Sequence, residues 1–390
     1  MLSGGGTGGH VYPLLTVVDE LHNRGRLALL GELELLYLGS EGSIEEQLCR
    51  RYGVPFRAIA AGALRGASPL TALKNAARSL AGLAQSWRIV GQFRPDVTLV
   101  TGGYVSVPVV LATRLRGRPA LVYLPDIVPG LAVRMLAHLA EKVAVSFPET
   151  VAHFAPGKAV VTGYPVRRQF YAADKTEARQ RLALDPHLPA LLVLGGSRGA
   201  HSINAAVAEN LAPLLNIAQV IHMTGAGDID EMTRRREALP PTLRARYHPH
   251  AYLHEELIDA MAAADLVIAR AGAATLGEFP AVGVPSILVP YPYSGQHQEP
   301  NADYMVQHGA ARKVADSELP TRLLPLVEEL LGQAADGTGT RSVRDEMQRQ
   351  ARALARPNAA HNIVKLLLEY APAAERRAGE TAPAEKGSAK

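Results

Sequence analysis

The first residues, MLSGGGTGGH, combine five glycines with Thr7 and His10. Glycines let a ligand approach the backbone closely, and a helix that begins after such a loop presents free amides to an anion. His10 follows the loop directly, and Pro13 predicts that a helix begins here. An imidazole at that place can take a proton from a bound hydroxyl group, although a histidine that only caps or packs the helix end is the alternative.

The spacing Gly4-x-Gly6-x-x-Gly9 also matches the dinucleotide-binding fingerprint. That fingerprint needs a strand before the glycines and an acidic residue at the end of the next strand. Here only three residues precede the glycines, and Glu41 comes later than the usual acidic position, after Gly39-Ser40. We therefore expect no nicotinamide or flavin cofactor, and we expect the first strand of this half to be truncated.

Two further glycine-rich segments suit a nucleotide. GGSRGAHSIN (195–204) places Ser197 and successive amides at a predicted helix start, which is either a phosphate site or a plain turn. RAGAATLGE (270–278) opens another helix with small residues, and its amides can hold a diphosphate. Glu278, one turn further on, can accept hydrogen bonds from a ribose diol, or it can simply stabilise the helix N-terminus.

A polar loop at 294–304 offers side chains that suit sugar hydroxyls: Gln296, His297, Gln298 and Asn301. A solvent loop with an asparagine cap is the alternative, but the position directly after a predicted strand favours a site. No spacing of His, Asp or Glu resembles a metal centre, so we expect no bound metal.

The elements that must position these motifs alternate short apolar runs with longer helical stretches. The runs are 33–40, 96–103, 119–125, 142–147 and 159–163, then 190–197, 219–225, 265–272 and 285–292. Because they are apolar throughout, they predict parallel strands covered on both faces, with the glycines at the carboxyl edge of each sheet. This pattern predicts two doubly wound α/β domains joined within 164–186, a helix over 359–371 and a disordered tail after it.

The composition is consistent with this organisation. A chain of 390 residues with 47% hydrophobic and 20% charged residues suits a globular protein of two domains. The single Cys49 excludes a disulfide framework, and neither a membrane span nor a signal peptide is recognisable. Residues 1–168 hold 18 lysines and arginines against 11 acidic residues, which predicts an anionic partner such as a membrane surface, a phosphate or a nucleic acid.

Taken in order, six motifs resemble the MurG family of bacterial peptidoglycan glycosyltransferases, from about residue 3 to residue 370. They are GGTGGHVYP (5–13), GGYVSVP (102–108), VTGYPVR (161–167), GGSRGA (195–200), RAGAATLGE (270–278) and HQEPNA (297–302). The resemblance implies the glycosyltransferase-B fold, two Rossmann-like domains facing a cleft. It implies an acceptor domain at 1–165, a UDP-sugar domain at 166–356, and a helix at 357–371 that packs back on the first domain, before the tail at 372–390.

The resemblance also implies a reaction and its residues. N-acetylglucosamine would pass, with inversion and without a metal or other cofactor, from UDP-N-acetylglucosamine to the 4-hydroxyl of undecaprenyl-linked muramyl-pentapeptide, with His10 as general base. Thr7, Gly8 and Gly9 would border the donor sugar and diphosphate. The other implied substrate-binding positions are Asp126, Arg167, Ser197, Ala273, Ala274, Thr275, Leu276, Gly277, Glu278, His297, Gln298 and Asn301.

Two positions depart from the family pattern, since Asp126 and Tyr164 each stand where an asparagine is usual. They affect the contacts expected to the sugar, and three alternatives stay open: a related lipid glycosyltransferase, a UDP-sugar epimerase and a sensor without turnover. We expect a peripheral protein on the cytoplasmic face of the cell membrane, with no nucleic-acid partner. The helix predicted at 68–93 is the expected membrane contact, through a stripe of Leu70, Leu73, Leu80, Leu83 and Trp87 with Lys74, Arg78 and Arg88 alongside. An ordinary amphipathic helix packed on its own sheet is the alternative.

Overall fold

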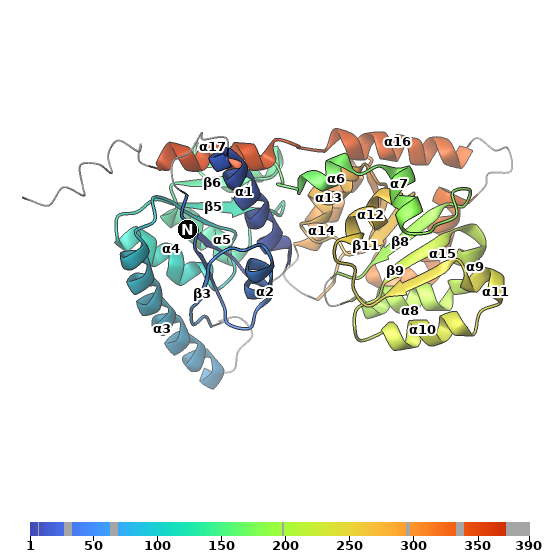
Figure 1. The fold of residues 1–390 in the computed structure, drawn as a ribbon, viewed down its shortest axis with the longest axis horizontal. Helices are drawn as coiled ribbons and strands as arrows, with labels where there is room; N and C mark the ends of the chain where they lie inside the picture. The colour runs from blue at the N-terminus through green and yellow to red at the C-terminus, as the bar shows by residue number, and fades with distance from the viewer. Residues whose placement is uncertain are drawn as a thin grey trace, which may run out of the picture.

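The protein consists of two α/β units that lie side by side (Figure 1). The computed structural model describes residues 1–6, 8–26, 33–62, 69–196, 199–293, 297–332 and 339–371. The tail predicted at 372–390 therefore lies outside the described residues. The domain limits 1–165 and 166–356 stay a prediction, but each half is built on one parallel sheet.

The N-terminal sheet has seven parallel strands in the order β3-β2-β1-β4-β5-β6-β7. The strands are β1 (Leu2–Ser3), β2 (Tyr37–Gly39), β3 (Phe56–Ala58), β4 (Thr98–Val100), β5 (Ala120–Leu124), β6 (Lys142–Val145) and β7 (Ala159–Val161). Short as it is, β1 lies at the sheet centre, where Leu2 is in register with Tyr37 of β2 and Leu99 of β4. This places the glycine-rich loop at the carboxyl edge of the sheet, as expected for a ligand site.

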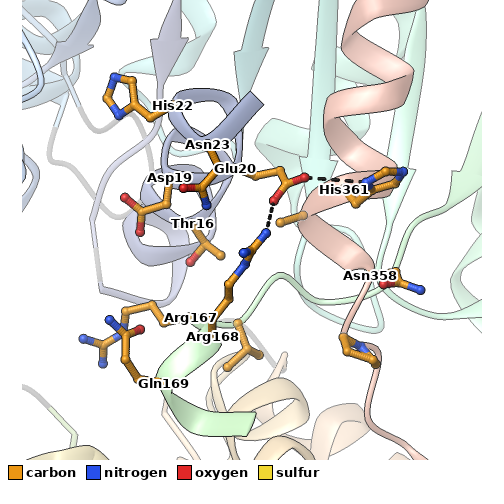
Figure 2. A pocket seen from close by; sticks show the side chains of 13 residues that line it. Thr16, Asp19, Glu20, His22, Asn23, Arg167, Arg168, Gln169, Asn358 and His361 are labelled. Carbon is orange, nitrogen blue, oxygen red and sulfur yellow. Dashed lines mark hydrogen bonds and ion pairs between the residues drawn. The ribbon is translucent and has the colours of Figure 1, made fainter. Parts of the chain in front are cut away.

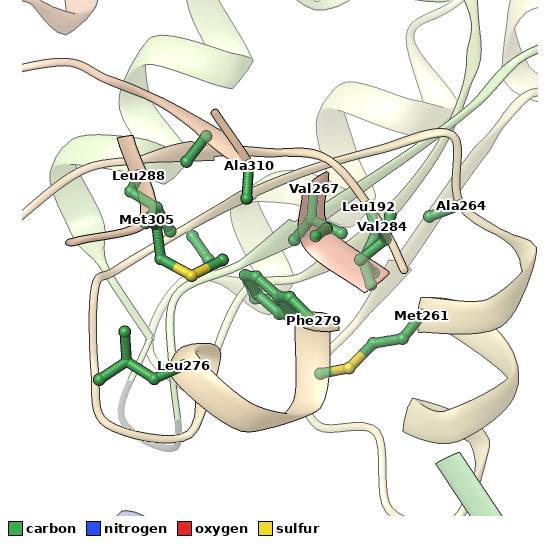
Figure 3. Close-up of a cluster of buried hydrophobic side chains, with 14 of the residues drawn as sticks. Leu192, Met261, Ala264, Val267, Leu276, Phe279, Val284, Leu288, Met305 and Ala310 are labelled. Carbon is green, nitrogen blue, oxygen red and sulfur yellow. The ribbon is translucent and has the colours of Figure 1, made fainter. Parts of the chain in front are cut away.

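The C-terminal sheet has six parallel strands in the order β10-β9-β8-β11-β12-β13. The strands are β8 (Ala190–Leu194), β9 (Gln219–Met223), β10 (Tyr247–His250), β11 (Leu266–Ala269), β12 (Ser286–Leu288) and β13 (Ala311–Lys313). On one face of this sheet Phe279 packs among Leu276, Met261 and Met305 (Figure 3). The packing fixes the helix that carries Glu278 against the sheet.

Helices cover both faces of each sheet. In the first half they are α1 (Gly8–Arg26), α2 (Ile44–Arg51), α3 (Pro69–Phe93), α4 (Ser106–Leu115), α5 (Leu131–Leu139) and the short η1 (Pro148–His153). The second half contains α6 (Arg168–Ala172), α7 (Lys175–Arg181), α8 (His201–Glu209), α9 (Leu211–Ile217), α10 (Ile229–Glu237), α11 (Pro241–Arg244), α12 (Glu256–Ala263), α13 (Thr275–Val282), α14 (Gln298–Gln307), η2 (Asp316–Glu318), α15 (Leu319–Leu331) and α16 (Gly339–Ala353). The last helix, α17 (Ala359–Tyr370), returns to the first half and packs on α1 (Figure 1).

Three strands, β3, β10 and β13, were not predicted from the sequence. All three lie at the edges of their sheets, and their sequences FRA, YHPH and ARK are not apolar runs. An edge strand needs less apolar surface because one side faces solvent, so the apolar-run criterion does not detect it. The helix start was also misplaced, since α1 begins at Gly8 and Pro13 lies inside it rather than at its first position.

Contacts between the two halves form a shared core. Ile127 and Phe147 of the first half pack in the same hydrophobic cluster as Phe279 and Met305 of the second. The ring of Phe147 lies 4.6 Å from that of Tyr304 on α14, centre to centre. The carboxyl edges of both sheets therefore approach one another, and the site can be built from both halves.

Candidate active site

The glycine-rich loop between β1 and α1 fits its surroundings closely. Gly6 has a φ of +102°, a conformation that suits glycine alone. A Cβ added to Gly4 would lie 2.0 Å from the Thr101 Oγ1, and one added to Gly5 would lie 2.5 Å from the Glu45 Oε1. The loop thus passes between two polar side chains, with no space for a Cβ at Gly4 or Gly5. Thr7, predicted to border the donor, lies outside the described residues.

His10, in the first turns of α1, is held by Thr101 at the end of β4. The His10 Nδ1 lies 3.1 Å from the Thr101 carbonyl oxygen, and the Thr101 hydroxyl donates to the His10 carbonyl at 2.8 Å. A carbonyl oxygen only accepts, so Nδ1 carries the hydrogen and the Nε2 of the neutral ring keeps a lone pair. No bond to Nε2 is found within the described part of the chain, and this arrangement suits a general base.

Thr101 is not among the site residues predicted from the sequence. It is buried, and it comes directly after the apolar strand β4 and before the motif GGYVSVP. A polar residue at the carboxyl end of a parallel strand was the signal that could have found it.

Glu278 lies in the first turn of α13, as the sequence predicts. Burial raises the pKa of its carboxyl to about 7, and the Arg167 guanidinium opposes this shift. Among the described residues its carboxylate has no recorded hydrogen-bond partner. A half-buried carboxylate without a hydrogen-bond partner is suited to accept hydrogen bonds from a ligand.

The turn before α13 leaves backbone donors free. The amides of Thr275, Leu276 and Gly277 already donate to the carbonyls three residues earlier. The described bonds leave the amides of Ala273 and Ala274 without a backbone acceptor, at the positive end of the helix dipole. Of the run Ala273 to Gly277, these two amides are the donors that the described backbone bonds leave open.

Arg167 lies in the segment that joins the two halves. Its guanidinium lies 5.2 Å above the ring of Tyr12 and 5.1 Å from that of Phe170. It also lines a cavity of about 610 Å³ to which both halves contribute, where Arg51 of α2 pairs with Glu255 at 2.7 Å. Arg167 is therefore a cation at the junction of the two halves.

Asp126 and Asn301 meet each other. The Asn301 side-chain amide donates to the Asp126 Oδ1 at 2.9 Å and to the Ala271 carbonyl at 3.1 Å, and its oxygen accepts from the Ile127 amide at 3.1 Å. Asn301 is completely buried and both of its amide hydrogens are used. In this arrangement Asn301 joins the two halves and offers no free donor to a sugar, whereas Asp126 keeps its second carboxylate oxygen.

His297 and Gln298 begin α14. The His297 ring faces the first half, because a Cβ added to Gly130 at the start of α5 would lie 3.3 Å from the ring Cε1. The Gln298 Oε1 accepts from the Tyr291 amide at 3.0 Å, so its NH₂ group is the part available to a ligand. Ser197 and Gln296 lie outside the described residues.

A second cavity, of about 380 Å³, lies where α1, α6 and α17 meet (Figure 2). There the Glu20 carboxylate pairs with Arg168 at 2.8 Å and with His361 at 3.5 Å. Of the predicted site residues only Arg167 lines it. It is thus a feature of the junction between the halves rather than part of the site.

The site therefore has two parts. One half supplies a histidine with a free ring nitrogen, and the other half supplies free helix amides and a carboxylate with a raised pKa. Such groups suit removal of a hydroxyl proton opposite a bound nucleoside diphosphate. No group of three or more His, Cys, Asp or Glu suited to a metal ion is found in the described part of the chain.

Two Rossmann-like domains that meet at their glycine-rich edges form the GT-B fold. Residues 1–145 match the glycosyltransferase family 28 N-terminal domain, and residues 190–362 match the glycosyltransferase family 28 C-terminal domain. The chain belongs to glycosyltransferase family 28.

Relatives extend along nearly the whole chain. The UDP-N-acetylglucosamine–N-acetylmuramyl-(pentapeptide) pyrophosphoryl-undecaprenol N-acetylglucosamine transferase of Roseiflexus sp. (strain RS-1) is 40% identical, over 94% of this chain and 93% of its own. The crystal structure of Acinetobacter baumannii MurG is similar with a TM-score of 0.69 and 27% identity, covering 95% of this chain and 99% of that one. The crystal structure of a UDP-GlcNAc 2-epimerase from Neisseria meningitidis is similar with a TM-score of 0.63 and 13% identity, covering 94% of this chain and 99% of that one. At this identity the likeness is one of fold alone.

None of the helices in the described ranges is both long and apolar enough to cross a membrane.

Proposed function

We infer that this chain transfers N-acetylglucosamine from UDP-N-acetylglucosamine to an N-acetylmuramyl-(pentapeptide) pyrophosphoryl-undecaprenol acceptor in peptidoglycan synthesis. The observation that carries this inference is the 40% identity to a transferase of that name along 94% of the chain. The site agrees with it, because one half supplies a base and the other half supplies groups for a nucleotide.

In the proposed reaction the acceptor 4-hydroxyl attacks the anomeric carbon of the donor. A carbon–oxygen bond forms to the acceptor, and the bond from the anomeric carbon to the diphosphate oxygen breaks with its electrons leaving on UDP. The acceptor proton passes to the His10 Nε2, which Thr101 keeps unprotonated by holding the hydrogen on Nδ1. Attack on the face opposite UDP inverts the anomeric carbon.

Charge that develops on the departing UDP needs stabilisation. The free amides of Ala273 and Ala274 at the start of α13 can donate to the diphosphate, and Arg167 adds a positive charge at the junction. Glu278 in the same helix would hold the ribose. We propose that no metal ion takes part, so EDTA should leave the rate unchanged, whereas loss of activity that magnesium restores would contradict this.

The test of the function is transfer of label from UDP-N-acetylglucosamine to a purified lipid-linked muramyl-pentapeptide. We expect a labelled disaccharide-lipid only when the acceptor is present. An epimerase, whose fold is similar, would instead convert the donor sugar in the absence of any acceptor. Release of UDP with a different lipid acceptor alone would identify a related lipid glycosyltransferase.

We also propose that the protein works as a peripheral protein on the cytoplasmic face of the membrane, since its acceptor carries a polyprenyl chain. On α3 the side chains of Leu80 and Trp87 are 70% and 41% exposed, whereas Leu83 packs inward. Arg116 lies 4.2 Å above the Trp87 ring, and Arg88 is exposed beside it. Exposed apolar groups with cations alongside suit an anionic lipid surface. The structure does not describe the side chains of the other predicted stripe residues Leu70 and Leu73, or that of Lys74.

A further inference from the structure

Helix α1 contains a gap in its hydrogen bonding next to the proposed base. Pro13 lies inside the helix and has no N–H group, so it cannot donate to the carbonyl of Gly9, four residues earlier. The hydroxyl of Tyr164 lies 3.4 Å from that carbonyl oxygen and donates to it. Tyr164 therefore supplies a bond that the helix itself cannot make, at the residue directly before His10.

The same tyrosine contacts the helix that carries Glu278. A Cβ added to Gly277 would lie 2.2 Å from the Tyr164 Cδ1, so the ring packs directly on the backbone of the first turn of α13. Tyr164 is only 4% exposed and packs in the core that both halves share. One side chain from the junction thus bridges the first turns of α1 and α13.

Packing fixes the position of the Tyr164 ring, and burial keeps its hydroxyl protonated. Its ring meets the ring of Tyr123 edge to face, with centres 6.5 Å apart. Burial raises the pKa of Tyr164 well above its ordinary value, and the charges of Glu278 and Asp126 raise it further. The hydroxyl is therefore a permanent donor, and it lies among residues of the proposed site.

We propose that Tyr164 is a positioning residue that sets the spacing between the base and the donor site. Its hydroxyl holds the turn that precedes His10, and its ring holds the turn that precedes Glu278. This proposal rests on the proposed roles of His10 and Glu278. It predicts that the two parts of the side chain have separable effects, one on turnover and one on donor binding.

Two variants separate these effects. Tyr164→Phe removes only the hydroxyl and should lower kcat about three- to tenfold, as expected for the loss of one neutral hydrogen bond, with the Kd for UDP-N-acetylglucosamine unchanged. Tyr164→Leu also removes the ring and should raise that Kd as well. Tyr247→Phe is the matched control, because it removes a buried hydroxyl that pairs with His222 at 2.8 Å on the C-terminal sheet; its kcat should stay at the wild-type value.

A double variant tests whether the hydroxyl acts through His10. In a His10→Ala background, Tyr164→Phe should have no further effect on turnover. If Tyr164→Phe lowered turnover equally in both backgrounds, the hydroxyl would not act through His10. The same conclusion would follow if Tyr164→Phe kept the wild-type kcat while His10→Ala was inactive. Either result would leave the role of His10 as base intact. Full turnover in His10→Ala would instead refute the assignment of the base.

Discussion

Replacement of Glu278 by glutamine removes a carboxyl whose pKa burial raises from 4.5 to about 7. Between these pH values the folded protein holds a proton that the unfolded chain has lost, so stability falls as the pH rises through this window. At 1.36 kcal/mol per pKa unit, the full penalty above pH 7 is about 3 kcal/mol. Because the side chain is only half-buried, we expect Glu278→Gln to increase the free energy of unfolding at pH 8 by about 1–3 kcal/mol, and to change it little at pH 4.

Donor binding should respond in the opposite sense. If the ionised carboxylate accepts from the ribose diol, the wild-type affinity for UDP-N-acetylglucosamine should rise about tenfold from pH 6 to pH 8, as the ionised fraction grows. Glu278→Gln should bind the donor more weakly at pH 8, by about 1.5–3 kcal/mol, with a flat pH profile. Calorimetry with this donor is suitable because each phosphorus of its diphosphate is esterified to a sugar and lacks the ionisation near pH 6 of a terminal phosphate.

Asp265→Asn provides the control for this experiment. Burial raises the pKa of Asp265, but its ion pairs and hydrogen bonds with Lys175, Arg179 and the Ala190 amide lower it overall. That variant should lose stability at neutral pH and keep the wild-type pH dependence of donor binding. If wild type and Glu278→Gln showed the same pH slope in calorimetry, the carboxylate would not be a ribose ligand.

Three further predictions concern the base and the membrane. His10→Ala should lower turnover about 10²–10⁴-fold with unchanged UDP affinity, and near-normal turnover would place the base elsewhere. Thr101→Val, which loses the hydroxyl that donates to the His10 carbonyl, should lower kcat while Thr101→Ser retains it; equal rates in steady-state assays would contradict the role of that hydroxyl. Changing Lys74, Arg78 and Arg88 together to Glu should abolish co-sedimentation with anionic vesicles but preserve activity on a soluble acceptor analogue, and undiminished sedimentation would refute docking through α3.

Much of the fold could be read from the sequence, because strands buried on both faces must be apolar along their whole length. The run at 190–197 contains β8 (Ala190–Leu194), and the run at 265–272 contains β11 (Leu266–Ala269). The glycines after such runs located the edge at which ligands bind, and α13 begins where the small residues of RAGAATLGE predict. These features are local, since each depends on the chemistry of a few consecutive residues.

The tertiary structure decided what local patterns do not encode. Asn301 pairs with Asp126, 175 positions away in the chain, and Tyr164 donates to Gly9, 155 positions away. The first bond exists only because the two halves dock edge to edge, and the second because the end of the first half folds back onto the start of α1. Burial of Glu278, which tertiary packing produces, raises the pKa of its carboxyl. The sequence by itself indicated which residue types could serve glycosyl transfer. Their distances and protonation depend on long-range packing, because burial and contact across a domain junction are properties of the folded chain alone.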